Sequence, residues 1–411
     1  LWKALNGLKP VRPMVIVEAI PWHEMDVDGE LVLQTEDDFC RYFETRLRRT
    51  LYAWKHMPAD MVVEPVVDVP IAIHGVDYGL SPSYRARALG LDVVERTVAI
   101  DPDSHIVSHE YEYVDQLATD EDVEKIVNPT IAVDEERTAR AEEKAHEIFD
   151  GVIAVEMQGY LTDFRPWDRI VEWHGAERTF VDLVERPEFM HKIMSRYTNA
   201  YLALVDQMEE QGLLGPLRSF STGVLGQRGI YLSSPDYTDE LPADGFDPAR
   251  PRPSRSAREC WGQGAAQIFA GVSPAMHQEF ELDYAVKYYS RFGLAHYGCC
   301  DQLHHKIDLL RKSIPNLRRI AMSPLADVEI GAEQIGGDFV FSRQPNPAVF
   351  ITDSWEPDFI ERELREEVDI CKRYGCPMDF LMKSISTVRY KPQRLWEWAD
   401  IAMRVVGDGH A

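Results

Sequence analysis

Short apolar runs alternate with longer amphipathic segments along most of the chain, the pattern of repeated strand and helix units around a parallel sheet. Strands are predicted at nine runs: 13–19, 61–69, 152–158, 217–222, 267–272, 294–298, 317–322, 339–342 and 380–383. Helices, most of which open on Pro or on an Asp or Ser cap, are predicted at 187–211, 274–291, 302–313, 327–335, 357–374 and 392–405. This number of units predicts an α/β fold, a TIM (β/α)8 barrel formed by residues 1–411 as one domain.

Two regions depart from this rhythm. Residues 51–118 contain β-branched alternation at 96–100 and 106–113, which predicts antiparallel strands in an N-terminal α+β insertion on the barrel. Residues 231–258 are rich in Pro, Ser, Asp and Arg and have no periodicity, which predicts a long surface loop or lid.

Composition narrows the class of protein. The chain has 411 residues, 45% of them hydrophobic, and no apolar run long enough to cross a bilayer, so a soluble chain outside the membrane is expected. With 44 basic and 69 acidic residues the net charge is -25, which argues against nucleic acid as a partner. Six cysteines in so long a chain, and an N-terminus without a secretory signal, predict reduced thiols in the cytoplasm. A homodimer is compatible with the sequence.

The most informative stretch is 292–301, FGLAHYGCCD, in which an apolar strand runs into a turn carrying His296, Cys299 and Cys300. Imidazole and thiolate are the ligands that zinc prefers, so these three residues are candidate metal ligands, with Glu259 as a fourth. Each has an alternative interpretation. A cysteine is often a buried small hydrophobe, His296 could be a hydrogen-bonded core residue, and Glu259 a solvated loop carboxylate.

Polar and aromatic residues that follow predicted strands are candidates for the same cavity, because barrel active sites gather at the carboxyl ends of the strands. Arg343 would leave the sheet into the cavity and could hold a carboxylate or phosphate, or else form a surface ion pair. Trp22 and Tyr297 could stack on a substrate or simply pack. The candidates at strand ends are Glu18, Trp22, His23, Gln158, Tyr297, Arg343 and Lys383.

Three segments carry a family resemblance in their order and spacing: 175–191 (GAERTFVDLVERPEFMH), 271–280 (GVSPAMHQEF) and the turn at 296–301. Together they resemble the uroporphyrinogen decarboxylase superfamily over about residues 153–406, and 9–19 is similar to that family's first barrel strand. The chain looks closer to the cobalamin-dependent methyltransferase branch. After the first strand it reads EAIPWHEM, where the decarboxylases carry an Arg-rich segment that grips the carboxylates of their substrate.

The resemblance implies an active-site zinc, a separate corrinoid protein as partner, and a small methylated substrate. A divalent cation would lower the pKa of a bound thiol or water and withdraw charge from the heteroatom that carries the methyl group. The sequence departs from the branch in its ligand spacing. It has His-x-x-Cys-Cys in place of His-x-Cys, and it reads KSISTVRYKP where the distant third cysteine would stand.

The function predicted from these features is a corrinoid-dependent methyltransferase that demethylates a small compound, an aryl methyl ether being one candidate for O-demethylation. A metal or acid group near Cys299 and Cys300, with His296, would activate the heteroatom, and Glu18 or His23 would manage the proton. Two alternatives stay open. One is a metal-free decarboxylase or lyase, in which Arg343 and Lys383 converge on a carboxylate. The other is a non-catalytic barrel that binds a ligand or a corrinoid protein.

Overall fold

A seven-stranded parallel sheet forms the centre of the computed structural model, which describes residues 1–63, 65–88, 91–96, 110–160, 162–215, 237–241 and 256–407. The strand order is β1-β14-β13-β12-β11-β10-β9. β2 (Val66–Pro70) and β8 (Ala154–Gln158) form a second, parallel pair. The strands of the large sheet are β1 (Met14–Val17), β9 (Asp163–Phe164), β10 (Trp261–Gly264), β11 (Leu294–Tyr297), β12 (Leu317–Met322), β13 (Val340–Arg343) and β14 (Met378–Met382).

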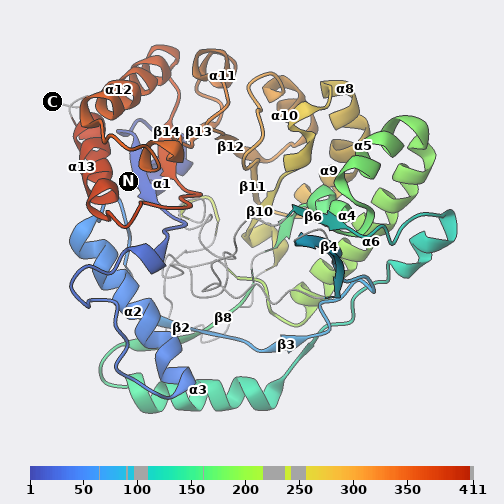
Figure 1. Ribbon diagram of the computed structural model, residues 1–411, viewed down its shortest axis with the longest axis horizontal. Helices are drawn as coiled ribbons and strands as arrows, with labels where there is room; N and C mark the ends of the chain where they lie inside the picture. The colour runs from blue at the N-terminus through green and yellow to red at the C-terminus, as the bar shows by residue number, and fades with distance from the viewer. Residues whose placement is uncertain are drawn as a thin grey trace.

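Most of the helices lie outside the strands in Figure 1, so the predicted mixed α/β architecture is confirmed, and it is consistent with a TIM-like fold. Their ends follow the expected capping chemistry. α12 begins at Pro357 and ends before Gly375, which has a left-handed backbone. The helices are α1 (Trp2–Asn6), α2 (Asp38–His56), α3 (Glu135–Phe149), α4 (Pro166–His174), α5 (Ala176–Glu185), α6 (Pro187–Glu210), α8 (Pro274–His277), α9 (Asp283–Tyr289), α10 (Ile307–Ser313), α11 (Val328–Ile335), α12 (Pro357–Tyr374) and α13 (Gln393–Gly407). No helix in the described ranges is long and apolar enough to cross a membrane.

Most predicted strands and helices agree with the structure to within a few residues, but the strand predicted at 267–272 is wrong. Residues Gln267–Gly271 form a 3-10 helix, and the strand lies earlier, at Trp261–Gly264. Its sequence, WGQG, has low strand propensity. Gly264 is needed there because a Cβ would collide with the Tyr289 hydroxyl and the Phe164 carbonyl. The helix predicted at 302–313 begins only at Ile307, and the strand predicted at 217–222 lies outside the described residues.

The predicted insertion divides into two parts. β4 (Ser83–Ala88), β5 (Leu91–Arg96) and β6 (Glu110–Tyr113) form an antiparallel sheet within 51–118. Of the two runs from which antiparallel strands were predicted, 96–100 and 106–113, only residues 96 and 110–113 lie within the described residues. The beginning of 51–118 instead holds the end of α2 and strand β2, which pairs in parallel with β8. Of the loop predicted at 231–258, only 237–241 and 256–258 lie within the described residues.

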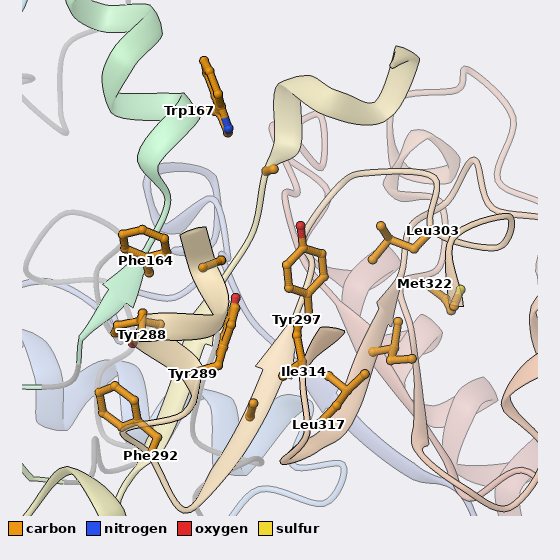
Figure 2. Packing of buried hydrophobic residues seen from close by; sticks show 14 of the residues in the cluster. Phe164, Trp167, Tyr288, Tyr289, Phe292, Tyr297, Leu303, Ile314, Leu317 and Met322 are labelled. Atoms are coloured by element: carbon orange, nitrogen blue, oxygen red, sulfur yellow. The ribbon is translucent and has the colours of Figure 1, made fainter. Parts of the chain in front are cut away.

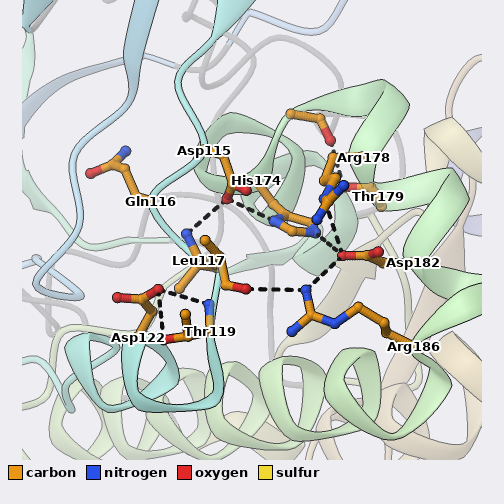
Figure 3. Close-up of polar contacts among 12 residues, drawn as sticks. Asp115, Gln116, Leu117, Thr119, Asp122, His174, Arg178, Thr179, Asp182 and Arg186 are labelled. Carbon is orange, nitrogen blue, oxygen red and sulfur yellow. Dashed lines mark hydrogen bonds and ion pairs between the residues drawn. The ribbon is translucent and has the colours of Figure 1, made fainter.

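A buried polar cluster fixes α4 to its neighbours (Figure 3). His174, the last residue of α4, is fully buried between two carboxylates, with Nδ1 2.9 Å from Asp115 Oδ1 and Nε2 3.0 Å from Asp182 Oδ2. Arg186 donates to the same Asp182 carboxylate at 3.2 Å and to the Ala118 carbonyl at 3.1 Å. The cluster therefore joins the segment after β6 to α4 and α5. It also holds the C-terminal end of α4, the helix whose first turn contributes a carboxyl group to the candidate site.

A second buried network joins the strands to α1. Arg319 on β12 forms an ion pair with Asp379 on β14, and Arg319 donates to Asn6 Oδ1 at 2.8 Å. The Ser342 hydroxyl on β13 donates to Asp379 Oδ1 at 2.8 Å. In-register neighbours on parallel strands point to the same face, and Ser342 is in register with Asp379. The network therefore lies on the face of the sheet that points away from the outer helices.

Replacing Arg319 with Met should lower the free energy of unfolding by about 3–5 kcal/mol, because the Asp379 carboxylate would stay buried without its cation. Urea unfolding measures this. The matched control is Arg373→Met, since the Arg373–Glu329 pair is exposed and should be worth less than about 1 kcal/mol. Equal costs for the two variants would contradict the prediction.

Candidate active site

The turn after β11 brings the two adjacent thiols to the carboxyl end of the sheet. Gly298 has a φ of 102°, and a Cβ there would collide with Leu303, so only glycine makes this turn without strain. The Cys299 N–H donates to Asp301 Oδ1 at 3.0 Å, which holds the turn closed. Cys299 and Cys300 therefore leave the strand in a fixed orientation.

Cys299 is enclosed by a thiol and two cations. Its Sγ lies 3.5 Å from Cys300 Sγ and 3.2 Å from Lys383 Nζ, which follows β14. The Arg165 guanidinium also interacts with this sulfur. Cys299 is only 8% exposed, whereas Cys300 is half-buried. Three separate parts of the chain thus meet at one sulfur atom.

These neighbours divide the protons between the two thiols. The hydrogen bond from Cys300 lowers the pKa of Cys299 below its ordinary value, and Lys383 and Arg165 add to this effect against the opposing effect of burial. The hydrogen bond to Cys299, together with burial, raises the pKa of Cys300. The two cations lie against Cys299, so the negative charge of the thiol pair is favoured on this sulfur.

The first turn of α4 adds a carboxyl group to the site. Arg165 stands immediately before the helix, and its Nε donates to Asp163 Oδ2 at 2.7 Å. Burial raises the pKa of Asp168 to about 7, an effect that Arg165 opposes and that Cys299 reinforces. A carboxyl that titrates near neutrality can give or take a proton under working conditions, as general acid or base catalysis requires.

His296 and Gln263 form a neutral polar pair of residues on neighbouring strands. They are in register on β11 and β10, and His296 is in register with Arg319, so all three side chains share one face of the sheet. Among the described residues, neither ring nitrogen of His296 nor Nε2 of Gln263 has a hydrogen-bond partner, although both residues are buried. Burial lowers the pKa of His296 well below its ordinary value, and Arg319, Lys383 and Arg165 add to this. The imidazole is therefore neutral and able to bind a polar group of a ligand.

The Tyr297 side chain points to the opposite face of the sheet, on the helix side, and packs against β11 from there. Its hydroxyl lies 2.6 Å from His277 Nε2 and donates to Glu281 Oε2 at 3.2 Å. Figure 2 shows the Tyr297 ring among the buried aromatic side chains beside β11, with Tyr289 nearby. In the structure the Tyr297 ring therefore packs against buried side chains, which is one of the two possibilities considered for it.

Arg343 also lies on the helix side, which corrects the expectation that it enters the cavity. It is in register with Met322 and Phe380, on the face opposite Ser342 and Asp379. Its Nε donates to Glu367 Oε1 on α12 at 2.8 Å, and a second nitrogen donates to the Ser323 carbonyl at 2.5 Å. The guanidinium is therefore part of the contact between sheet and helix.

The residues after β1 have separate roles. Glu18 is buried, and its backbone N–H donates to the backbone carbonyl of Met382 at 2.8 Å. This hydrogen bond places Glu18 beside Lys383, at the carboxyl end of β14. Trp22 packs edge-on against Tyr52, with ring centroids 5.8 Å apart. The His23 side chain is 43% exposed, and its Nε2 lies 3.6 Å from Glu24.

Two further candidates lie at element ends. Gln158 is the last residue of β8 and is half-buried. Its backbone carbonyl accepts the Ile71 N–H at 3.2 Å. The Glu259 carboxylate accepts the Ser256 N–H at 2.8 Å as part of a capping box. Glu259 is therefore a helix-capping residue, in contrast to the ligand role considered for it.

The donor set for a zinc ion is incomplete in the described parts of the chain. No three His, Cys, Asp or Glu side chains there come together as a metal-binding group. The Lys383 ammonium lies against Cys299, in the position of a counter-ion to the thiolate. A protein zinc site usually has three or four ligands, so the geometry does not fit the predicted zinc, and no step below depends on it.

Sequence reasoning missed Arg165 and Asp168. They follow the two-residue strand β9, which is too short to show a periodicity. The available signal was FRPWD itself, in which a Pro that starts a helix is preceded by an Arg and followed by an Asp in the first turn.

Comparisons with known proteins support the fold. No protein-family model matches the chain, and no curated protein is similar to it in sequence. Among solved structures, a methyltransferase from Methanosarcina mazei is similar, with a TM-score of 0.50 and 12% sequence identity over 100% of this chain and 98% of that chain. At this identity the similarity establishes a shared fold.

Proposed function

We propose that this chain is a methyltransferase that moves a methyl group from a small methylated compound to the corrinoid of a partner protein. The observation that carries the proposal is the cluster of Cys299, Lys383, Arg165 and Asp168, formed after β11, β14 and β9 on a fold shared with a methyltransferase. Strand ends are the part of such a fold where substrates bind.

The chemistry that the cluster could perform is stabilisation of a poor leaving group. When the bond between the methyl carbon and the substrate heteroatom breaks, the electron pair stays on the heteroatom. Lys383 and Arg165 would stabilise the developing negative charge, and Asp168 in its protonated form would donate a proton to the heteroatom. The Cys299 thiolate would hold the two cations in place. The partner's corrinoid would supply the nucleophile that accepts the methyl group.

The structure bears on the alternatives through Arg343. The decarboxylase alternative expected Arg343 and Lys383 to converge on a carboxylate, but Arg343 pairs with Glu367 on the helix side. The methyl-transfer proposal needs no residue from that side of the sheet, because its acid and both its cations come from the cluster at the strand ends.

Replacement of both thiols tests the proposal. Wild-type protein, a panel of methyl ethers, methylamines and methyl thioethers, and free cob(I)alamin are combined without oxygen, and the loss of cob(I)alamin absorbance is followed. We expect Cys299→Ala/Cys300→Ala to slow methyl transfer by about 10²-fold or more, because the cations lose the thiolate that positions them.

Cys371→Ala/Cys376→Ala is the matched control, since it removes the other close pair of thiols, in and just after α12. Equal rates for the two double variants would refute the proposal. Binding of a methylated compound with no transfer by wild-type protein would favour a non-catalytic barrel.

A further inference from the structure

The two thiols of the site have the arrangement of a peroxide-reactive pair. Cys299 and Cys300 are adjacent in sequence, their sulfurs are 3.5 Å apart, and one sulfur contacts an ammonium at 3.2 Å. A thiolate held by cations is the form that reacts with hydroperoxides, and a second thiol within reach can then resolve the product. The methyl-transfer proposal uses Cys299 only to hold charge and leaves this reactivity unassigned.

We propose that Cys299 and Cys300 form a modification site that reacts with hydrogen peroxide or a small organic hydroperoxide and closes to a disulfide between neighbouring residues. Cys299 attacks, Cys300 resolves, and Lys383 with Arg165 stabilises the attacking sulfur.

The two steps balance. In the first step the Cys299 thiolate attacks one peroxide oxygen and the O–O bond breaks. The leaving group is hydroxide from hydrogen peroxide or alkoxide from an organic hydroperoxide, and it takes a proton to become water or an alcohol. Cys299 is now a sulfenic acid. In the second step the Cys300 thiol gives up its proton and its sulfur attacks the Cys299 sulfur, the S–O bond breaks, and the sulfenic hydroxyl leaves with that proton as water. Two thiols are oxidised and one peroxide is reduced.

The surroundings favour these roles for the two residues. Cys300 is the more exposed thiol, and the Cys299 thiolate that raises its pKa is gone once Cys299 is oxidised, so Cys300 can then lose its proton and attack. Asp301 accepts the Cys299 N–H at 3.0 Å, which keeps both side chains at one turn. Cys299 is 8% exposed, and a peroxide is small enough to reach its sulfur.

The chain contains a second close thiol pair that serves as an internal comparison. Cys371 and Cys376 interact with each other, and Cys376 Sγ lies 3.3 Å from the Ala332 carbonyl. Within the described residues, no Lys or Arg is among the groups that lower the pKa of Cys376. This pair has the proximity without the ammonium contact, so it should react slowly.

The test is brief exposure of the full chain to hydrogen peroxide, followed by blocking of free thiols and peptide mass analysis. In wild-type protein we expect the peptide with Cys299 and Cys300 to lose two hydrogen atoms at least about tenfold faster than Cys371 and Cys376 are modified, and dithiothreitol to reverse the change. In Cys300→Ser, dimedone should trap a sulfenic acid on Cys299. In Cys299→Ser, the remaining Cys300 should react no faster than Cys40.

Equal oxidation rates for the two pairs, or dimedone capture on Cys300 in place of Cys299, would overturn the proposal. So would a wild-type product that is only sulfinic acid on Cys299, because resolution by Cys300 would then have failed. Lys383→Met gives a further check, since it leaves both sulfurs in place and should slow the first step. The experiment requires no methylated substrate, so its result does not depend on whether methyl transfer is found.

Discussion

Replacing Lys383 with Met should raise the pKa of Cys299 and slow its alkylation by iodoacetamide in the acidic range. Lys383 Nζ lies 3.2 Å from the sulfur, in a buried setting where solvent screens little of the interaction. Arg165 and the Cys300 thiol remain in the variant, so the pKa of Cys299 should rise without returning to that of a buried thiol alone. We expect the midpoint of the alkylation rate against pH to move upward by at least about one unit, which is tenfold in rate below the midpoint.

Two variants separate the cation from other effects. Cys300→Ala removes the hydrogen bond to the thiolate and should also move the midpoint upward, whereas Cys300→Ser keeps a donor and should move it less. Lys192→Met removes a cation from an exposed pair with Asp120 and should leave the profile unchanged. An unaltered midpoint in Lys383→Met would show that the ammonium does not set the charge of Cys299.

The sequence was sufficient to predict the parts of the fold that depend on local periodicity. Residues 317–322 and 357–374 were predicted at the bounds that the structure shows, because the first is a short run with apolar ends and the second is an amphipathic helix with clear end signals. β10 was misplaced because its glycines serve close packing with Tyr289 and Phe164, which are distant in sequence. A glycine that is required by close packing against another element produces no hydrophobic periodicity in its own strand.

The candidate site was predicted only in part for a related reason. Cys299, Cys300 and Lys383 were identified from their place after strands, and the structure brings them together. Arg343 occupies an equivalent place but points the other way, since a shift of one residue along a strand reverses the face. The expectation that it enters the cavity depended on an exact strand end, which the sequence placed one residue too early.

His296 shows a different limit. It was considered as a metal ligand because imidazole and thiol occur three residues apart. In the structure it shares a buried face with Gln263 and Arg319, and burial together with the nearby cations lowers its pKa and keeps it neutral. Its environment is set by β10 and β12, so no pattern within 292–301 could have distinguished a ligand from a neutral hydrogen-bonding group.

Replacing Asp168 with Asn should lower the rate of methyl transfer by about 10²–10⁴-fold, the usual contribution of a general acid. Burial raises the pKa of Asp168 to about 7, so the protonated form that can protonate a leaving group is abundant at neutral pH. The groups that act on this carboxyl are Arg165, which lowers its pKa, and Cys299, Asp163 and Asp301, which raise it. The wild-type rate should therefore fall as the pH rises above about 7, and the Asn variant should lack this dependence. The measurement is the rate of cob(I)alamin methylation across this pH range.

The stability of the fold provides the control. The direction in which stability changes with pH follows from the raised pKa of Asp168. The folded pKa of Asp168 is raised above the unfolded value of about 3.9. The stability that its proton contributes is thus fully present below that value and is lost as the pH rises through about 7. Asn carries no charge at any pH, so near pH 8 the variant should melt at a temperature no lower than wild type. A slow variant with wild-type stability would identify Asp168 as the acid. An Asn variant that transfers methyl groups at the wild-type rate, with the same pH profile, would remove Asp168 from the mechanism.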